Sequence, residues 1–336
     1  MTKCQIILTY SICQLCNTTT MTFPAFNSCV CDNGYRWWYL DAVSDDGAQA
    51  LTVIVFVGSV FSPYYAWARK SGAASADAHC AINIALYGHN NCWTMTERAA
   101  NSIERSANYY RIGPSSVRVE NQELIYAIDE IAVPLPQRVV GEIRVGLNPI
   151  TTKPISIDST EQHQWQALAP KTRINVNFVK PDVKWSGNAY VDTNWGTEPM
   201  EDAFISWNWS RAHLDCGDTV VQYDVERRDG TDELKTLRFD QRTASPVTHA
   251  SLTDQRSLPV TRYWRQPRLT RTEQNAEVSN LKTLEDTPFY SRSSFNTVIE
   301  GHDAVSIHES IDFDRIRKSW VQHLLPFRMP RITRPS

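Results

Sequence analysis

The residues best suited to chemistry are a carboxyl group and an amide that stand beside an indole ring. The stretch YVDTNWG, residues 190–196, places Asp192 and Asn194 next to Trp195. A few oriented polar groups among aromatic faces are typical of a deep, mostly apolar pocket. A carboxyl group in such a pocket can act as a general acid or base. We therefore predict that Asp192 is a candidate catalytic residue of a site for a large apolar ligand.

A second carboxyl group, Asp224, has a similar setting. It follows Tyr223 and comes shortly after WNWSR, residues 207–211. Consecutive residues of a regular strand point to opposite faces, so Tyr223 and Asp224 cannot both face one pocket unless a bulge intervenes. For this reason Asp192 ranks above Asp224 as the candidate acid. Both carboxyl groups also have a structural alternative, because either could cap a turn or pair with an arginine such as Arg211.

Other aromatic-rich stretches could contribute to the same kind of pocket. Residues 58–67 (GSVFSPYYAW) follow an apolar run, and residues 93–98 (WTMTER) come after a stretch that begins at His79. His79 is itself more readily explained as a structural histidine than as a catalyst. The tryptophans at positions 37 and 38 point to opposite sides of a strand, so one of them is expected to be plain core. The aromatic residues that we expect to contact the ligand are Trp38, Tyr64, Tyr65, Trp67, Trp93, Trp195, Trp207 and Trp209.

The sequence lacks the motifs of several other chemistries. It contains no glycine-rich phosphate loop, no GxSxG elbow and no HExxH pair. Cys13 and Cys16 have the spacing of half a metal or redox site, but no second CxxC or histidine pair accompanies them. The formal net charge of −3 gives no overall attraction for nucleic acid. We therefore expect no metal, no cofactor and no nucleic-acid partner.

Short β-strands dominate the predicted secondary structure. Alternating or β-branched apolar runs recur along the chain and are separated by turn formers such as Asp45-Asp46-Gly47. Helical periodicity is found only at residues 95–107 and 314–325. Many short antiparallel strands with few helices are typical of closed or sandwiched sheets, so we predict an all-β protein. The predicted strands are residues 51–57, 80–87, 116–120, 124–128, 139–145, 172–179, 220–225, 234–239, 294–299 and 304–307.

Two stretches that lie 170 residues apart are similar to each other. WWYLDAVSDDG, residues 37–47, and WNWSRAHLDCG, residues 207–217, align without gaps, and each precedes an apolar strand. The alignment matches Trp37 with Trp207 and the turn glycines with each other. We interpret the two stretches as the opening hairpins of two homologous β-barrels. The alternative is coincidence, because β-proteins often carry tryptophan on strands and Asp-Gly in turns.

This repeat predicts how the chain is divided. A boundary falls near residues 195–202, where Gly196, Pro199 and acidic residues interrupt the pattern. Residues 243–286 carry three prolines and mixed charge and are expected to form a long loop. No apolar run is long enough to span a membrane as a helix. The predicted parts are a poorly ordered leader without signal-peptide features at 1–32, barrels at 33–198 and 199–318, and a basic, apolar tail at 319–336.

Six ordered blocks of the sequence resemble the carotenoid 1,2-hydratase family, also called hydroxyneurosporene synthases, of phototrophic bacteria. The blocks are GYRWWYLDAVSDDG, VFVGSVFSPYYAWARKSG, HCAINIALYG, WTMTER, YVDTNWG, and WNWSRAH followed by YD, and the similarity runs from about residue 33 to about residue 330. The resemblance implies two lipocalin-like β-barrels. It also implies that water is added, without a cofactor, to the terminal 1,2 double bond of an acyclic carotene such as neurosporene, lycopene or a 1-hydroxy derivative.

The residues are consistent with that implied reaction. Hydration of this alkene needs a proton at C2, which leaves a tertiary cation at C1 that water captures. A carboxylic acid desolvated among aromatic rings keeps its proton near neutral pH, because burial disfavours the charged form. Each aromatic face near the cation contributes about 1–2 kcal/mol when desolvated. We expect Asp192 or Asp224 to be the acid and Tyr223 or Asn194 to position the water.

Other functions and partners remain to be distinguished. The same barrel could belong to a carrier that only binds a carotenoid or another lipid, or to a related enzyme that modifies a different terpenoid. The cysteine usage predicts a cytoplasmic protein. A membrane-resident substrate and the basic tail together predict peripheral binding to the inner or intracytoplasmic membrane.

Overall fold

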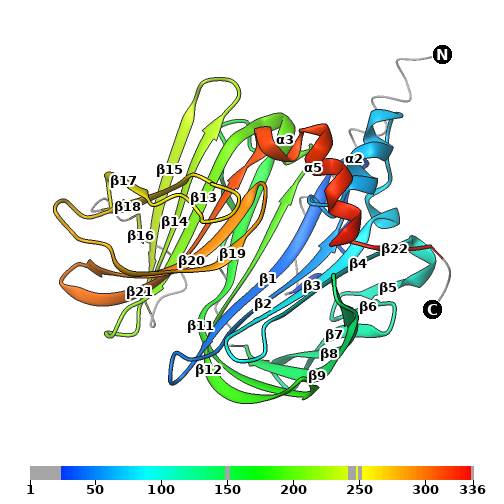
Figure 1. The fold of residues 1–336 in the computed structure, drawn as a ribbon, viewed down its shortest axis with the longest axis horizontal. Helices are drawn as coiled ribbons and strands as arrows, with labels where there is room; N and C mark the ends of the chain where they lie inside the picture. The colour runs from blue at the N-terminus through cyan, green and yellow to red at the C-terminus, as the bar shows by residue number, and fades with distance from the viewer. Residues whose placement is uncertain (1–23, 148–151, 241–246, 249–251, 334–336) are drawn as a thin grey trace. The chain divides into compact units, whose positions relative to one another are not determined.

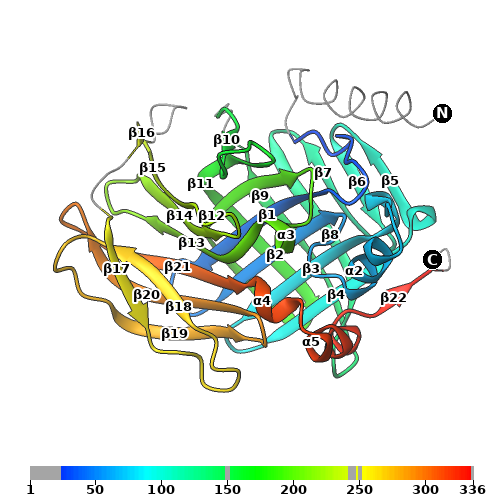
Figure 2. The same cartoon turned by 90° about the horizontal axis from the view of Figure 1, so that it is seen from above.

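The computed structural model describes residues 24–147, 152–240, 247–248 and 252–333. These residues form mostly antiparallel β-strands with a few short helices (Figures 1 and 2), which confirms the predicted all-β class. They divide into two compact units. Unit 1 comprises residues 1–148, 172–197 and 326–336, and unit 2 comprises residues 149–171 and 198–325. The chain therefore passes from one unit to the other four times, after residues 148, 171, 197 and 325.

Unit 1 is built on a large sheet. Its strand order is β22-β4-β3-β2-β1-β12-β11-β9-β8-β7-β6-β5, with β10 paired to β11. Strand β10 and residues 163–171 of β11 belong to unit 2, and the rest of the sheet belongs to unit 1. The sheet curls, and the curl brings β4 next to β8, which are far apart in the strand order. Arg98 on β4 contacts Glu130 on β8, with Nη2 and Oε2 2.8 Å apart. The strands are β1 (Tyr35–Ser44), β2 (Ala50–Val57), β3 (Cys80–Tyr87), β4 (Cys92–Arg98), β5 (Ile103–Ser106), β6 (Tyr109–Ile112), β7 (Ser115–Glu120), β8 (Glu123–Ala132), β9 (Gln137–Gly146), β10 (Ile155–Ser156), β11 (His163–Lys180), β12 (Asp182–Gly196) and β22 (Arg331–Ile332).

The alternation of β1 gives unit 1 two different faces. Trp38 points into the curl, where its ring lies 5.0 Å from that of Phe26 and 6.0 Å from that of Tyr110 on β6. We call this side the inner face and the opposite side, which carries Trp37 and Tyr39, the outer face. The inner face is the apolar core of unit 1. The short helices of this unit are α2 (Pro63–Lys70), η1 (Ala76–Ala78) and η2 (Ala100–Ser102).

Unit 2 contains a seven-stranded antiparallel sheet and a separate two-stranded one. The larger sheet has the order β16-β15-β14-β13-β21-β20-β19, and β17 pairs with β18. The strands are β13 (Phe204–His213), β14 (Thr219–Arg227), β15 (Asp232–Phe239), β16 (Val247–Thr248), β17 (Asp254–Leu258), β18 (Arg268–Thr272), β19 (Ser279–Asp286), β20 (Tyr290–Ile299) and β21 (His302–Asp312). The helices between Pro199 and Phe327 are α3 (Met200–Ala203), α4 (Phe313–Ile316), α5 (Ser319–Leu324) and η3 (Leu325–Phe327).

The two stretches that are similar in sequence form hairpins of the same kind. In each hairpin the turn glycine has a positive φ, 68° at Gly47 and 99° at Gly217. The glycine N–H donates to the carbonyl three residues earlier, at Ser44 in one hairpin and at Leu214 in the other. A residue with a side chain is strained at such a φ, which explains the glycine at both positions. The two hairpins are alike, but the strand order of each sheet runs from one edge strand to another, so two closed barrels are not confirmed.

One of the two predicted helices is wrong. Residues 95–107 form the end of β4, a single 3₁₀ turn and β5 rather than an α-helix. Glu97 and Arg98 lie on β4 and are buried, so they are not the exposed charges of a helix. The predicted helix at 314–325 is confirmed as the two short helices α4 and α5. In the part of the chain that the structure describes, no helix is long and apolar enough to cross a membrane.

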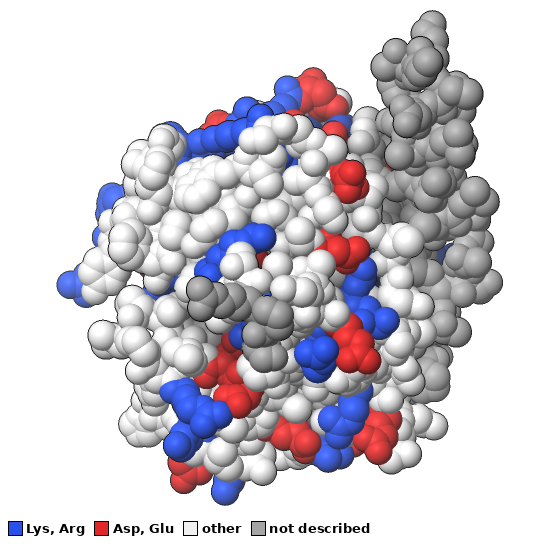
Figure 3. Space-filling view, turned by 90° about the vertical axis from the view of Figure 1, so that its right-hand side faces the viewer, with Lys and Arg blue, Asp and Glu red and all other residues white. Residues whose placement is uncertain are grey.

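The ends of the chain carry structure that composition did not indicate. Residues 24–32, within the expected leader, are described, and Trp38 Nε1 donates to the carbonyl of Pro24 over 2.9 Å. The rest of the leader, residues 1–23, lies outside the described residues. Near the other end, β22 pairs in parallel with β4, and Arg331 stands beside Glu97. On the face drawn in Figure 3, Lys and Arg side chains are interspersed with Asp and Glu side chains.

Candidate active site

Asp192 lies on the outer face of unit 1. Strand β12 pairs with β1 in a register that sets Asp192 opposite Tyr39 and Asn194 opposite Trp37. Directly opposed residues of antiparallel strands project from the same face, so these four side chains share one side of the sheet. The same register sets Tyr190 opposite Asp41. The sequence expectation that Asp192 and Asn194 share an aromatic environment therefore agrees with the strand pairing.

The carboxyl group of Asp192 is buried and hydrogen-bonded. Its residue is 2% exposed, and Tyr190 Oη donates to Oδ2 over 2.7 Å. A donor to a carboxylate stabilises its charged form, whereas burial disfavours that form. The hydrogen bond from Tyr190 and the burial of the side chain thus have opposite effects on the charged form of Asp192. Such a balance suits a carboxylic acid that must carry a proton and then release it. Sequence reasoning missed Tyr190, although its position two residues before Asp192 on a strand could have indicated it.

Aromatic rings surround this part of the outer face. Trp37 stacks on Tyr35 with ring centroids 5.0 Å apart and lies 6.3 Å from Phe56. The rings of Tyr39 and Tyr190 meet edge to face at 6.3 Å. Trp37, rather than the predicted Trp38, is therefore the tryptophan of this pair that shares a face with Asp192.

Two of the predicted tryptophans lie on the inner face instead. Trp38 is a core residue, and Trp195 is opposite Arg36 across the β1–β12 pair. The guanidinium carbon of Arg36 lies 5.2 Å from the ring centroid of Trp38 and 4.7 Å from that of Trp195. Burial, with a smaller effect of Arg105, lowers the pKa of Arg36 to about 9. These tryptophans enclose a buried cation on the side of the sheet opposite Asp192.

The other predicted aromatic residues of unit 1 have different settings. Trp93 on β4 shares the outer face, because it pairs with Ala85 on β3, which pairs with Thr52 on β2, which pairs with Asp41 on β1. The guanidinium carbon of Arg328 lies 4.4 Å from the centroid of the Trp93 ring. Tyr64 and Trp67 are neighbours on α2, with ring centroids 5.6 Å apart.

Tyr65 is part of the framework of unit 1. It is fully buried, and its hydroxyl donates to the carbonyl of Gly34 over 2.8 Å. Its ring stacks on His79 at 4.7 Å. The imidazole Nδ1 of His79 lies 2.9 Å from Glu97 Oε1, and Arg331 contacts both side chains. Burial first, and then Arg331 and Arg69, lower the pKa of His79 to about 4. This cluster fits the structural role expected for His79.

Asp224 in unit 2 is an ion-paired carboxylate. Arg271 on β18 donates to it through Nε to Oδ2 over 2.6 Å and through Nη2 to Oδ1 over 3.3 Å. The register of β13 and β14 places Asp224 opposite Asn208, on the other face from Tyr223 and Trp209. The structural alternative of an arginine partner therefore applies to Asp224, although the partner is Arg271 and not Arg211.

Tyr223 belongs to an aromatic cluster of unit 2. Its ring lies 5.3 Å from that of Trp207 and 5.4 Å from that of Trp165 on β11. Trp209 is opposite Tyr223 in the strand register and shares its face. The predicted association of Tyr223, Trp207 and Trp209 agrees with this arrangement, and Trp165 is a member that the sequence did not suggest. Residue 165 is far from the others along the chain, which explains why no local pattern revealed it.

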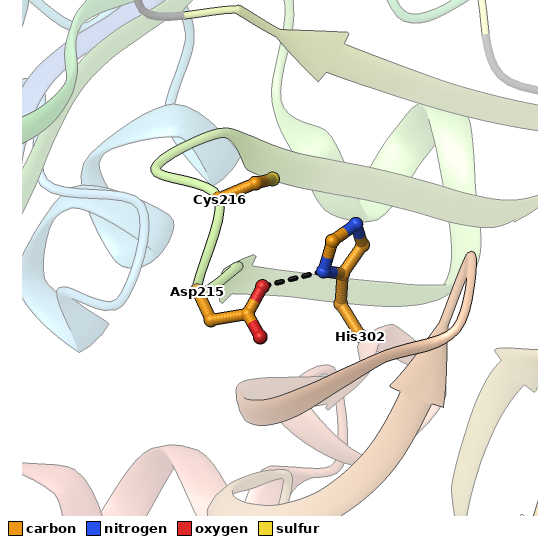
Figure 4. A group of neighbouring side chains, drawn as sticks. All are labelled: Asp215, Cys216 and His302. Carbon is orange, nitrogen blue, oxygen red and sulfur yellow. Dashed lines mark hydrogen bonds and ion pairs between the residues drawn. The ribbon is translucent and has the colours of Figure 1, made fainter.

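One group of potential metal ligands lies in unit 2. Asp215, Cys216 and His302 come from the β13–β14 and β20–β21 turns, and their ligand atoms lie within 4.8 Å of one another (Figure 4). His302 Nδ1 contacts Asp215 Oδ1 directly. Arg238 Nη2 lies 3.8 Å from Cys216 Sγ. A metal ion would have to compete with that guanidinium, so we assign the group no role.

The fold of this chain is similar to the folds of solved proteins. It is similar to an AttH protein from Nitrosomonas europaea, with a TM-score of 0.63 and 11% identity over 88% of this chain and 98% of the other. It is also similar to CghA in complex with Sch210972, with a TM-score of 0.57 and 12% identity over 88% and 92%. At these identities the likeness defines the fold alone.

The sequence comparisons then identify the family. The sequence model of the carotenoid hydratase family, CrtC, matches residues 53–336, so the chain belongs to that family. An acyclic carotenoid 1,2-hydratase of Thiocapsa roseopersicina is 43% identical over 310 residues, which are 92% of this chain and 76% of that protein. A protein of the same name from Rubrivivax gelatinosus is 43% identical with the same coverage. One from Rhodobacter capsulatus is 31% identical over 83% of this chain and 97% of its own length.

Proposed function

We propose that the protein is an acyclic carotenoid 1,2-hydratase in which Asp192 is the general acid. The observation that carries the assignment is the buried Asp192 carboxyl group, which accepts a hydrogen bond from Tyr190 and shares its face of the sheet with aromatic rings. The family supplies the reaction, which is addition of water across the terminal 1,2 double bond of an acyclic carotene. Neurosporene, lycopene and their 1-hydroxy derivatives carry such a terminus.

The reaction begins with transfer of a proton from Asp192 to C2 of the alkene. The π electrons form the new C–H bond, so that C1 becomes a tertiary cation and Asp192 a carboxylate. The hydrogen bond from Tyr190 stabilises this carboxylate and so favours the transfer. Water then forms the C1–O bond and loses a proton, which returns Asp192 to its acid form. The net change is one water added, without an oxidant, a reductant or a metal in any step.

The cation at C1 needs negative charge density without a competing nucleophile. The faces of Trp37 and Tyr39 are aromatic candidates for this role, because the strand register places them opposite Asn194 and Asp192. Each desolvated cation–π contact contributes about 2 kcal/mol. Asn194 is 1% exposed and lies on the same face, so we assign it the positioning of the attacking water.

The test is hydration of lycopene in detergent by purified protein, followed by mass analysis. The wild-type protein should add one or two waters, whereas Asp192→Asn should lower the rate by about 10²–10⁴-fold, the usual contribution of a general acid. Asp224→Asn is the matched control, and its rate should stay within a few fold of wild type. Equal rates for Asp192→Asn and wild type would refute the assignment. An unchanged substrate mass with the wild-type protein would instead indicate a carrier.

We further propose that the protein works in the cytoplasm as a peripheral protein of the membrane that holds its substrate. The C-terminal basic residues that suggested this are partly engaged within the molecule. Arg331 contacts Glu97, Arg328 covers Trp93, and Arg315 donates to the carbonyls of Trp264 and Arg265. We therefore expect the membrane-binding surface to consist of side chains that are exposed and have no such contact within the molecule.

A further inference from the structure

The loop between β17 and β18 displays aromatic side chains to solvent. Its central residues read RYWR, Arg262 to Arg265, and all four are exposed. Tyr263 is 75% exposed and Trp264 is 39% exposed. Large aromatic residues usually bury most of their surface, so two adjacent exposed rings indicate a function for the loop.

The loop is held in place by hydrogen bonds. The carboxylate of Asp286 accepts from the backbone N–H of Tyr263 over 2.7 Å and from that of Trp264 over 3.3 Å. The loop is closed at its base, where Thr261 N–H donates to the carbonyl of Gln266 and Gln266 N–H donates to Thr261 Oγ1. These contacts fix the backbone while the side chains of Tyr263 and Trp264 project outward. The exposure of the two rings is therefore a defined feature of the fold.

Helix α5 adds a third aromatic residue to the same surface. Trp320 is 47% exposed, and its ring stacks on Trp264 with centroids 5.8 Å apart and an interplanar angle of 18°. Leu324, one turn further along α5, is 41% exposed, whereas Val321 on the other side of the helix is fully buried. The exposed side of α5 and the rings of Tyr263 and Trp264 thus form one aromatic and apolar surface.

Positive charges border this surface. Arg262, Arg265 and Lys318 are exposed, and in the described part of unit 2 none of the three takes part in an ion pair that the structure records. The guanidinium carbon of Arg262 lies 5.5 Å from the ring centroid of Tyr263. We refer to Arg262, Tyr263, Trp264, Arg265, Lys318, Trp320 and Leu324 as the Trp264–Trp320 patch.

We propose that the Trp264–Trp320 patch rests on the surface of a bilayer that contains anionic lipids. Tryptophan and tyrosine prefer the headgroup region, where an apolar ring and a polar edge are both satisfied. Arginine and lysine at the same level are attracted by anionic headgroups. The patch combines both features. The proposal rests on the proposed function only in that an acyclic carotene is dissolved in a bilayer, and it is tested without any carotene.

The test is cosedimentation of the full chain with vesicles of phosphatidylcholine, with or without phosphatidylglycerol. The wild-type protein should bind the anionic vesicles more tightly than the neutral ones, and the difference should fade as salt is added. Arg262→Ala/Lys318→Ala should weaken binding to anionic vesicles by about 25-fold, since each basic residue near the surface contributes about fivefold. Trp264→Ala/Trp320→Ala should weaken binding to both kinds of vesicle.

Matched controls come from exposed residues elsewhere in unit 2. Arg256→Ala removes an exposed arginine from β17, and Val305→Ser removes an apolar side chain that is 51% exposed on β21. Both controls should bind like wild type, and circular dichroism should show that all variants are folded. Binding by the patch variants equal to that of wild type, or a wild-type protein that does not bind anionic vesicles, would overturn the proposal. A patch variant that binds no vesicles yet hydrates detergent-dispersed lycopene normally would separate docking from catalysis.

Discussion

The phenolic O–H of Tyr190 donates a 2.7 Å hydrogen bond to Oδ2 of Asp192, and both side chains project from the outer face of β12. The donor sits where the negative charge of Asp192 appears after proton transfer. A hydrogen bond to a charged group contributes about 1.5–3 kcal/mol, which corresponds to roughly 10–150-fold in rate. Tyr190→Phe should therefore lower kcat for lycopene hydration by about that factor. Tyr109→Phe on β6 is the control, and an unchanged kcat for Tyr190→Phe would contradict the role.

Adjacent tryptophans on β1 should respond differently to the same substitution. Trp37→Ala removes a ring from the face of Asp192, so hydration should slow by about 30-fold, the equivalent of about 2 kcal/mol. Trp38→Ala empties a site in the core and should lower the free energy of unfolding by about 3–5 kcal/mol. Urea unfolding and kcat, measured on both variants, compare the two effects. The reverse pattern would mean that the two faces are assigned incorrectly.

The ion pair between Asp224 and Arg271 predicts a change in stability rather than in chemistry. Arg271→Gln leaves a mostly buried carboxylate without its partner, which should lower the free energy of unfolding by on the order of 2 kcal/mol. Asp224→Asn in the same background should restore part of that loss. Activity per folded molecule should stay close to wild type throughout. A loss of kcat in the Arg271→Gln variant that exceeds its loss of folded protein would implicate Asp224 in catalysis.

The buried histidines make stability depend on pH. His79 has a pKa of about 4 in the folded protein and of about 6.5 when unfolded, so the unfolded chain binds more protons between these values. Stability should therefore be fully present above pH 6.5 and fall as the pH is lowered towards 4. His308, whose pKa burial lowers to about 4, acts in the same direction. Thermal unfolding of His79→Gln should show a smaller fall over this window than wild type. A fall of equal size in both proteins would exclude His79 as a contributor.

A chelator tests the expectation that no metal takes part. Proton transfer from Asp192 and capture by water require no metal, so lycopene hydration should continue at the same rate after dialysis against EDTA. Asp215→Asn and His302→Gln, which alter the group of potential ligands in unit 2, should likewise leave kcat unchanged. Loss of activity on chelation that zinc restores would require a different mechanism.

Local patterns predicted several of the strands, but residues 243–286, which were expected to form a long loop, contain β17, β18 and β19. The run CAINIALY matches β3 residue for residue, because an apolar, β-branched sequence between turn formers has few alternatives. The opposite faces of Tyr223 and Asp224 also followed from the two-residue period of a strand. These predictions need only neighbouring residues, so a single sequence contains the information.

The incorrect predictions depended on distant residues. Which of Trp37 and Trp38 faces Asp192 is set by the register between β1 and β12, which are more than 130 residues apart in the sequence. Residues 95–107 look helical because charged and apolar residues alternate at helical spacing. In the folded strand, Glu97 contacts Arg331 and Arg98 contacts Glu130. No short window contains those partners.

Because the chain passes between its two units four times, neither unit is encoded by one continuous stretch. A single cut in the gene cannot release either unit whole, and β22 at residues 331–332 belongs to the same sheet as β1 at residues 35–44. Exchanging halves with a relative would therefore mix segments that must match in the folded chain. Useful chimeras of this enzyme would have to exchange whole surfaces, such as one face of a sheet, rather than contiguous halves.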